Sequence, residues 1–308
     1  METKLIGGPK GLKASIVGVG CNAFGKRIDE TTTHAVIDAA IDAGMNFFDT
    51  AETYGGGLSE KYIGSGMKGR RDNMIIATKF GHSHSNVEGK KKGSPENVKA
   101  TAEKALKALR TDRIDLFQQH RPDSATPVAE TLGALEDLVK EGKILFYGCS
   151  YYSGVEMQEA IDEASKNNLK GFVTAQNSWN MLTRDIETDL IPVCASNNIG
   201  LLPYYPIAKG LLTGRYKRGD SPEPGSRMDG ADDLEKADFE LVERLEKFSK
   251  DNGYDLLTLA ISWLASQSCI ASVISGASKP EQLALNANAA RWKLSASDFE
   301  EIDRLLLS

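Results

Sequence analysis

Phe48-Asp49-Thr50-Ala51-Glu52-Thr53-Tyr54-Gly55 is the stretch around which the rest of the chain is organised. Residues 33–44, before it, have a pattern typical of a helix, and residues 46–48 have that of a short apolar strand. An acid, Asp49, therefore stands at a strand's end, with a tyrosine, Tyr54, five residues later in the following loop. One such pair is more often structural than functional, so its meaning depends on the strands that follow.

The unit of a short strand followed by a helix recurs along the chain, and most strand candidates are the continuous apolar runs expected of a buried parallel sheet. Strands are predicted over residues 16–20, 46–49, 74–79, 114–119, 144–149, 172–176, 201–205 and 271–274. Helices are predicted over residues 31–43, 59–67, 95–109, 127–140, 153–167, 184–197, 234–251, 256–266, 280–290 and 297–307. This alternation predicts an α/β protein with a (β/α)8 TIM barrel, and leaves a doubly wound open sheet as the alternative.

Three further features complete the predicted architecture. Residues 4–13 contain Gly7-Gly8-Pro9 between short apolar pieces, which predicts an N-terminal β-hairpin. The segment 207–233 is rich in glycine, proline and charge, and we expect this long loop after strand 7 to cover the barrel mouth. No second domain is evident, so residues 1–308 are predicted to form one domain.

Composition and charge narrow the function classes. The formal net charge of −6 is spread without a long run of one sign, so nucleic acid is not an expected partner. Cys21, Cys149, Cys194 and Cys269 lack CxxC spacing, which favours free thiols over disulfides or zinc. The N-terminus has no apolar signal core, and no stretch approaches the roughly eighteen apolar residues of a membrane span. We expect a cytoplasmic protein without a membrane partner.

Two later strand ends carry further reactive side chains. Lys79 ends the strand predicted at 74–79, and His120 directly follows the strand predicted at 114–119. The carboxyl ends of barrel strands meet at one face of the fold. Asp49, Tyr54, Lys79 and His120 are therefore predicted to form one site.

A His-x-His pair lies in the loop after Lys79. His82 and His84 have a spacing that can bind metal, but no acid or cysteine cluster accompanies them. We predict that this loop forms the rim of a substrate pocket, together with Phe80 and Trp179, and that the chain holds no metal.

Five stretches follow one another along the chain: NFFDTAETYG (46–55), IATK (76–79), DRIDLFQQH (112–120), PYYPIAKGLLTG (203–214) and GASKPEQ (276–282). Together they resemble the aldo-keto reductase superfamily and occur in the family's order. The long seventh loop makes the chain similar to the bacterial and potassium-channel β-subunit branch. The resemblance implies that a small-molecule aldehyde or ketone is reduced to an alcohol by NADPH, or that the reverse reaction occurs.

Carbonyl reduction gives each of the four strand-end side chains a role. Hydride addition builds negative charge on the carbonyl oxygen, and Tyr54 can supply the proton that this oxygen needs. The Lys79 ammonium stabilises the phenolate and so lowers the pKa of Tyr54 from its usual value of about 10. Asp49 supplies the counter-charge for Lys79, and His120 can donate a hydrogen bond that orients the carbonyl.

The resemblance also places the nicotinamide end of the cofactor. Residues 18–23 fit the G-x-G-x-x-A pattern of dinucleotide sites, but Phe24-Gly25-Lys26-Arg27 intervenes before any helix, so we interpret them as the first strand and its loop. The family's nicotinamide contacts fall here on Gly20, Cys21, Asn22, Asp49, Tyr204 and Tyr205, with Ser150 and Gln176 at the carboxamide. Tyr151 replaces an asparagine, and Tyr205 a serine, that are common in the family.

The phosphate and adenosine contacts fall later in the chain. Backbone groups of Pro206, Ile207, Ala208, Lys209, Gly210 and Leu211 correspond to the pyrophosphate site, and Gly276, Ser278, Gln282 and Asn286 to the adenosine site. Arg215 and Arg227 match positions that pair with phosphates, and the planar fork of arginine suits a 2′-phosphate. Gln282 stands where other branches carry an arginine, which weakens the preference for NADP(H). NADP(H) is still favoured, because of the two arginines, and NAD(H) remains possible.

Two other functions stay open at this point. A nucleotide-sensing subunit that binds NADP(H) with little turnover is compatible with the channel-subunit resemblance. An aldolase-like barrel with Lys79 as a Schiff base is the other alternative, which Asp49 disfavours because such a lysine needs a lowered pKa and no tight carboxylate partner. The sequence predicts neither the substrate nor an oligomeric state.

Overall fold

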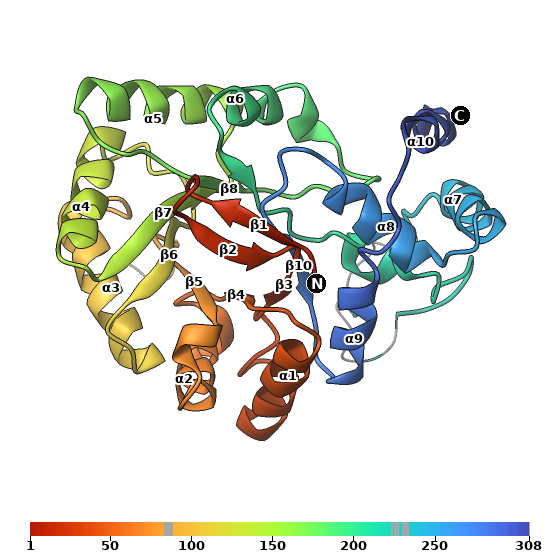
Figure 1. Cartoon of the computed structure of the whole chain (residues 1–308), viewed down its shortest axis with the longest axis horizontal. Helices are drawn as coiled ribbons and strands as arrows, with labels where there is room; N and C mark the ends of the chain where they lie inside the picture. The colour runs from red at the N-terminus through yellow and green to blue at the C-terminus, as the bar shows by residue number, and fades with distance from the viewer. Residues whose placement is uncertain (83–88, 223, 225–227, 230–233, 308) are drawn as a thin grey trace.

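The structure, a computed structural model, describes residues 1–82, 89–222, 224, 228–229 and 234–307. Its centre is a sheet of eight parallel strands in the order β10-β3-β4-β5-β6-β7-β8-β9 (Figure 1). The strands are β3 (Val17–Gly20), β4 (Phe47–Asp49), β5 (Ile75–Phe80), β6 (Ile114–Gln119), β7 (Ile144–Ser150), β8 (Thr174–Gln176), β9 (Gly200–Leu201) and β10 (Val273–Gly276). The predicted succession of strands is confirmed.

The two end strands of this sheet, β9 and β10, also meet each other and close the barrel. Parallel bridges join Leu201 to Ile270 and Tyr204 to Ile274. The Ile274 amide donates to the Pro203 carbonyl at 3.0 Å. β9 is shorter than the predicted segment 201–205, because Pro203 has no amide hydrogen to continue the ladder. Closure excludes the open-sheet alternative.

The N-terminal hairpin covers one end of the barrel, as predicted. Strands β1 (Thr3–Ile6) and β2 (Leu12–Ser15) pair antiparallel and lie across the centre of the ring of strands in Figure 1. Ile6 and Ala14 pack with Phe47 and Ala77 inside the barrel. Because Phe47 begins β4, the hairpin closes the end opposite to the carboxyl ends of the strands.

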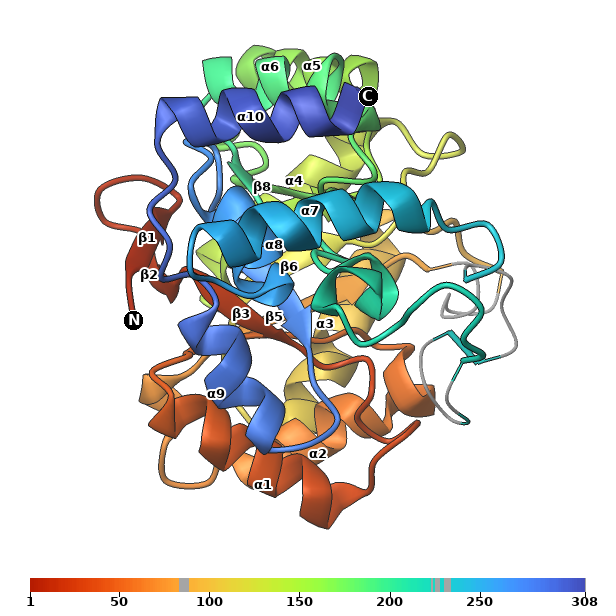
Figure 2. The same ribbon diagram turned by 90° about the vertical axis from the view of Figure 1, so that its right-hand side faces the viewer.

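Helices surround the sheet (Figures 1 and 2). They are α1 (Glu30–Asp42), α2 (Leu58–Gly66), α3 (Pro95–Leu109), α4 (Val128–Lys140), α5 (Gly154–Lys166), α6 (Leu190–Ser196), α7 (Phe239–Asp251), α8 (Leu256–Ala265), α9 (Glu281–Asn288) and α10 (Ala296–Leu307). Short 3-10 turns are η1 (Tyr54–Gly57), η2 (Arg71–Asn73), η3 (Asp185–Glu187) and η4 (Ala208–Thr213). Figure 2 shows α10 beside α7, where the Arg244 guanidinium donates to the Leu305 carbonyl at 3.3 Å.

Local signals explain where several helices begin. Ser94 caps α3 ahead of Pro95, and Ser153 forms a capping box with Glu156 at α5. The helix predicted over 184–197 is instead a 3-10 turn followed by the short α6. Pro192 lies in the first turn of α6, where a proline is tolerated, and its ring prevents the helix from extending further back.

Three wider observations bear on function. No helix among the described residues is both long and apolar enough to cross a membrane. All four cysteines are free thiols, of which Cys21, Cys149 and Cys194 are buried. Within the described ranges, no group of three or more His, Cys, Asp or Glu side chains is placed to hold a metal ion.

Candidate active site

The carboxyl ends of the strands surround a cavity of about 600 Å³. Strand register places Gly276 beside Gly20, and Gly20 beside Asp49, at one level of the barrel. Asp49, Tyr54 and His120 line the cavity directly. The predicted convergence of strand-end side chains on one place is therefore seen in the structure.

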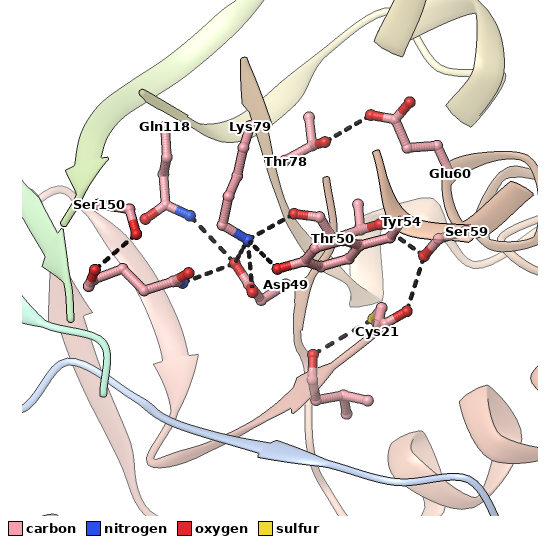
Figure 3. A network of polar contacts seen from close by, with 12 residues as sticks. Cys21, Asp49, Thr50, Tyr54, Ser59, Glu60, Thr78, Lys79, Gln118 and Ser150 are labelled. Carbon is pink, nitrogen blue, oxygen red and sulfur yellow. Dashed lines mark hydrogen bonds and ion pairs between the residues drawn. The ribbon is translucent and has the colours of Figure 1, made fainter. Parts of the chain in front are cut away.

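Asp49 and Lys79 form a buried ion pair below this cavity (Figure 3). The Lys79 ammonium donates to both carboxylate oxygens of Asp49 and to the Thr50 carbonyl, each at 2.8 Å. The amides of Gln118 and Gln176 donate to Oδ1 of Asp49 at 3.2 and 2.9 Å. Burial lowers the pKa of Lys79, but Asp49 and Tyr54 outweigh it and hold that pKa above its ordinary value. Lys79 is therefore a fixed cation.

A glycine turn brings Tyr54 to Lys79. Gly55, Gly56 and Gly57 all have positive φ, which lets the chain turn sharply after the tyrosine. A Cβ on Gly55 would lie 2.5 Å from the Phe24 carbonyl oxygen, so this turn also requires a residue without a side chain. Lys79 donates to the Tyr54 hydroxyl at 3.4 Å. Burial raises the pKa of Tyr54 above its ordinary value although Lys79 opposes that rise, so the predicted net lowering of this pKa was wrong. The phenol keeps its proton at neutral pH, with a cation beside it.

His120 faces Tyr54 across the cavity. The two ring centroids are 6.1 Å apart and nearly perpendicular, and the His82 ring lies 4.8 Å from that of His120. Burial, reinforced by the positive charge of Lys79 and by other neighbours, lowers the pKa of His120 to about 2. The imidazole is therefore neutral, and its Nδ1 is buried without a hydrogen-bond partner. A neutral imidazole with an unused nitrogen suits recognition of a polar ligand atom.

The residues predicted at the nicotinamide end divide into two groups. Those that line the cavity are Gly20, Cys21, Asn22, Asp49, Gln176, Tyr204 and Tyr205. Ser150 does not line it, and its hydroxyl donates to the Gln176 backbone carbonyl at 2.7 Å. Oδ1 of Asn22 is buried without a hydrogen-bond partner. The buried, unpaired acceptor of Asn22 and the rings of Tyr204 and Tyr205 that line the cavity fit a flat ring that carries an amide.

The loop after β9 has an unusual backbone. Tyr205, Ala208 and Lys209 have φ values of 57°, 45° and 59°, and Gly210 follows with 115°. Positive φ is strained for residues with side chains and is concentrated at binding and active sites. Pro206, Ile207, Lys209 and Gly210 line the cavity, whereas the structure places Ala208 and Leu211 outside its lining.

The far end of the cavity is formed by β10 and α9. Gly276, Ser278, Gln282 and Asn286 all line it. Oε1 of Gln282 accepts from the backbone amides of Ser278 and Lys279 at 2.8 and 3.1 Å, so this side chain also holds the loop before α9. Arg215 lines the cavity as well. Arg227 and His84 lie outside the described residues.

Several lining residues were not among the predicted cofactor contacts. They are Arg27, Tyr151, Thr213, Pro224, Leu257, Ile274, Ala277, Lys279 and Leu285. Lys279 lies within the stretch 276–282, which already contained predicted cofactor contacts, so its place at the cavity could have been predicted. No sequence pattern indicated Arg27. Thr213, Arg215 and Pro224 show that the described part of the segment 207–233 reaches the cavity.

The charges around the cavity are strongly biased. Arg27, Lys209, Arg215 and Lys279 line it, and Asp49 is the one carboxylate among its described lining residues. Asp49 is already neutralised by Lys79. The cavity therefore favours an anionic ligand.

Two predicted rim residues are instead structural. Phe80 is fully buried and its ring packs on that of Phe117 with centroids 4.8 Å apart. Trp179 is buried, packs on Trp263 and donates its indole N–H to Glu187 at 2.9 Å. Neither lines the cavity, so their assignment to the rim was wrong. Successive strand residues face opposite sides, and Lys79 takes the inward position beside Phe80.

Comparison with known proteins identifies the fold and the family. The sequence pattern of the Aldo/keto reductase family matches residues 16–307. The chain belongs to the aldo/keto reductase family. This aldo/keto reductase is 33% identical over 305 residues to "Probable aldo-keto reductase 1" of Glycine max, covering 96% of the chain and 86% of the relative. It is 33% identical over 297 residues to a "Probable voltage-gated potassium channel subunit beta" of Arabidopsis thaliana, covering 92% and 89%.

A solved structure supports the same assignment. The glycerol dehydrogenase of Gluconobacter oxydans superposes on this aldo/keto reductase with a TM-score of 0.86 and 27% identity, covering 99% of this chain and 95% of the dehydrogenase. Family and fold together make the chain an oxidoreductase with a (β/α)8 barrel.

Proposed function

We propose that this aldo/keto reductase reduces a small-molecule aldehyde or ketone to an alcohol, or catalyses the reverse reaction, with NADP(H) as cofactor. The single observation that carries the proposal is the contact between the Lys79 ammonium and the Tyr54 hydroxyl at 3.4 Å, at the edge of a cavity that Asp49 and His120 also line. A protonated phenol beside a fixed cation is suited to give a proton to a carbonyl oxygen and to carry the resulting negative charge.

Each side chain of the site has a distinct task in this proposal. NADPH supplies the hydride when it is bound, and the chain supplies the proton and the orientation. Tyr54 donates the proton from its hydroxyl, and Lys79 stabilises the phenolate that remains. Asp49 keeps Lys79 charged and fixed in position. The neutral His120 directs a ring nitrogen toward the substrate oxygen and limits its possible orientations.

The shape and charge of the cavity support a dinucleotide. A flat ring fits against Tyr204, where the unpaired acceptor of Asn22 could meet an amide. The strained turn that contains Lys209 and Gly210 presents backbone groups to the cavity, as pyrophosphate sites do. Arg215 and Lys279 are cations at the opposite end, where a 2′-phosphate would be held, which favours NADP(H) over NAD(H).

Cofactor titration combined with a turnover assay tests the proposal. We expect the protein to bind NADPH and to oxidise it when aldehydes or ketones are added. Tyr54→Phe should lower turnover by about 10²- to 10⁴-fold and leave NADPH binding intact. Tyr62→Phe is a matched control, because Tyr62 in α2 does not line the cavity, and should change neither quantity. If the wild-type protein does not bind NADPH, the proposal is rejected.

A nucleotide-sensing role is the second candidate, favoured by the relative that is named a potassium channel β subunit. A sensor would bind NADPH but oxidise it no faster in wild-type protein than in Tyr54→Phe. A Schiff-base aldolase finds no support, because Lys79 holds a tight carboxylate partner and a raised pKa.

A further inference from the structure

The catalytic end of the cavity carries more positive charge than the cofactor or a neutral carbonyl substrate would use. Lys209, Arg215 and Lys279 belong to the two segments that form the phosphate and adenosine ends. Arg27 instead comes from the loop after β3, which packs on the Tyr54 turn, since a Cβ on Gly25 would meet Leu58 at 2.4 Å. Arg27 therefore lines the cavity at the end where Tyr54 lies.

A second arginine, Arg121, does not line the cavity itself but stacks on a residue that does. Arg121 directly follows His120, and its guanidinium carbon is 3.4 Å from the centroid of the Tyr151 ring. Tyr151 lines the cavity, and its ring lies 5.4 Å from that of Tyr204. Arg121 is half-buried, and within the described part of the chain it has no ion-pair partner. A half-buried guanidinium without a counter-charge is costly unless a ligand supplies one.

The backbone at Tyr151 supports a binding role for this arrangement. Tyr151 has a φ of 63°, a conformation that a bulky residue rarely adopts. Strain of this kind persists where the surrounding structure needs the side chain in one place, typically at a binding site. Here it places the ring under the guanidinium of Arg121 and beside the ring of Tyr204. A stacked guanidinium retains N–H donors in its own plane for a second acceptor.

We propose that the carbonyl substrate of this enzyme carries a carboxylate, which Arg121 binds from its position over Tyr151 while Arg27 adds positive charge from the lining of the cavity. This inference rests on the proposed reductase function and specifies its substrate class. The planar guanidinium matches a carboxylate with two parallel hydrogen bonds. Asp49 does not oppose such an anion, because Lys79 already neutralises it.

Matched pairs of an acid and its methyl ester test the proposal. The probes are 4-carboxybenzaldehyde with methyl 4-formylbenzoate, and succinic semialdehyde with its methyl ester. For each pair the measured quantity is the ratio of kcat/KM for the acid to kcat/KM for the ester, so that differences in intrinsic reactivity cancel between protein variants. We expect at least one pair to favour the acid in wild-type protein, with a ratio that falls as salt concentration rises.

Substitutions of Arg121 decide whether this residue is responsible. Arg121→Met should lower the ratio by about 10- to 100-fold, as expected for the loss of hydrogen bonds to a charged group. Arg121→Lys should recover part of the loss, because it keeps the charge without the planar fork. Arg304→Met removes an exposed arginine of α10 that pairs with Glu301 and should leave the ratio unchanged.

The possible failures differ from one another. If esters are reduced as well as acids, or if Arg121→Met changes both by the same factor, the carboxylate proposal is overturned while the reductase function stands. If none of the four aldehydes is reduced, the proposed function fails and this inference fails with it.

Discussion

Replacing Asp49 with asparagine should destabilise the protein by an amount that depends on pH. Lys79 is fully buried, and its ammonium meets both carboxylate oxygens of Asp49 at 2.8 Å. The amides of Gln118 and Gln176 donate to the same carboxylate. An asparagine would remove the counter-charge of Lys79. Its amide N–H groups would also face the other hydrogen-bond donors that now point at the carboxylate. Removing one partner of a buried ion pair costs about 3–5 kcal/mol of unfolding free energy.

The sign of the pH dependence follows from the pKa of Lys79. Burial lowers this pKa, while Asp49 and Tyr54 raise it above its ordinary value. In wild-type protein the stabilisation is complete below the unfolded pKa of about 10.4 and is lost only as pH rises through the folded value. Without Asp49, burial dominates, and the folded lysine releases its proton more readily than the unfolded one. The stability of the variant then rises with pH, by at most about 1.4 kcal/mol per unit.

Urea unfolding followed by far-UV circular dichroism, between about pH 6.5 and 9, measures this effect. The control is Asp137→Asn, whose partner Lys99 lies 2.9 Å away in a half-exposed pair and whose loss should cost less than about 1 kcal/mol. The deficit of Asp49→Asn relative to wild type should be largest at the acidic end of this range and shrink toward the alkaline end. A deficit that is independent of pH, or no larger than that of the control, would refute the reasoning.

Three further predictions concern the site and the barrel. Because the pKa of His120 is lowered to about 2, the imidazole stays neutral at ordinary pH. The rate should therefore show no dependence on pH between about pH 5 and 8 that comes from this residue. A pH dependence in this range that disappears in His120→Asn would contradict the prediction. Gly148→Ala should lower the unfolding free energy by about 1–3 kcal/mol in thermal or urea melts, because its Cβ would lie 2.1 Å from Oγ1 of Thr174. Gly133→Ala in α4, whose Cβ would meet no atom within 4 Å, should instead raise it by about 0.5–1 kcal/mol. Arg215→Ala should weaken NADPH binding by about tenfold and NADH binding much less, whereas equal losses in fluorescence titrations would remove Arg215 from the 2′-phosphate site.

The barrel was predictable because its signals are local. Apolar strand runs, the serine and proline at the start of α3 and the capping box of α5 all act within a few residues. The boundaries of β9 and α6 were less predictable. Each depends on a single proline, Pro203 or Pro192, and on which neighbouring strand or helix supplies the competing hydrogen bonds. Those neighbours are distant in the sequence.

The strand-end set could be located from the sequence for a geometric reason. Parallel strands in a barrel present their carboxyl ends to one face, so Asp49, Lys79 and His120 had to approach one another once the strands were assigned. The distance between Tyr54 and Lys79 could not be deduced in this way. It depends on one turn made of three consecutive glycines, Gly55, Gly56 and Gly57, which packs against the loop after β3. Phe80 was predicted at the rim of the pocket but is buried in the core. Because successive residues of a strand face opposite sides and Lys79 faces inward, the sequence could already have shown that Phe80 faces outward.

Only the tertiary structure decided which charges face the cavity. Arg27 and Lys279, which line the cavity, and Arg121, which stacks on the lining residue Tyr151, each look like ordinary loop cations in the sequence. A charge in a loop can point to solvent or to a ligand at almost equal local cost. The stack of Arg121 on Tyr151 depends on a left-handed backbone directly after β7 and on the second residue after β6. The sequence by itself determined the barrel and the four strand-end groups, because strand order and direction place them. The positions of the loop charges around the cavity were determined by long-range packing of loops, which no local pattern encodes.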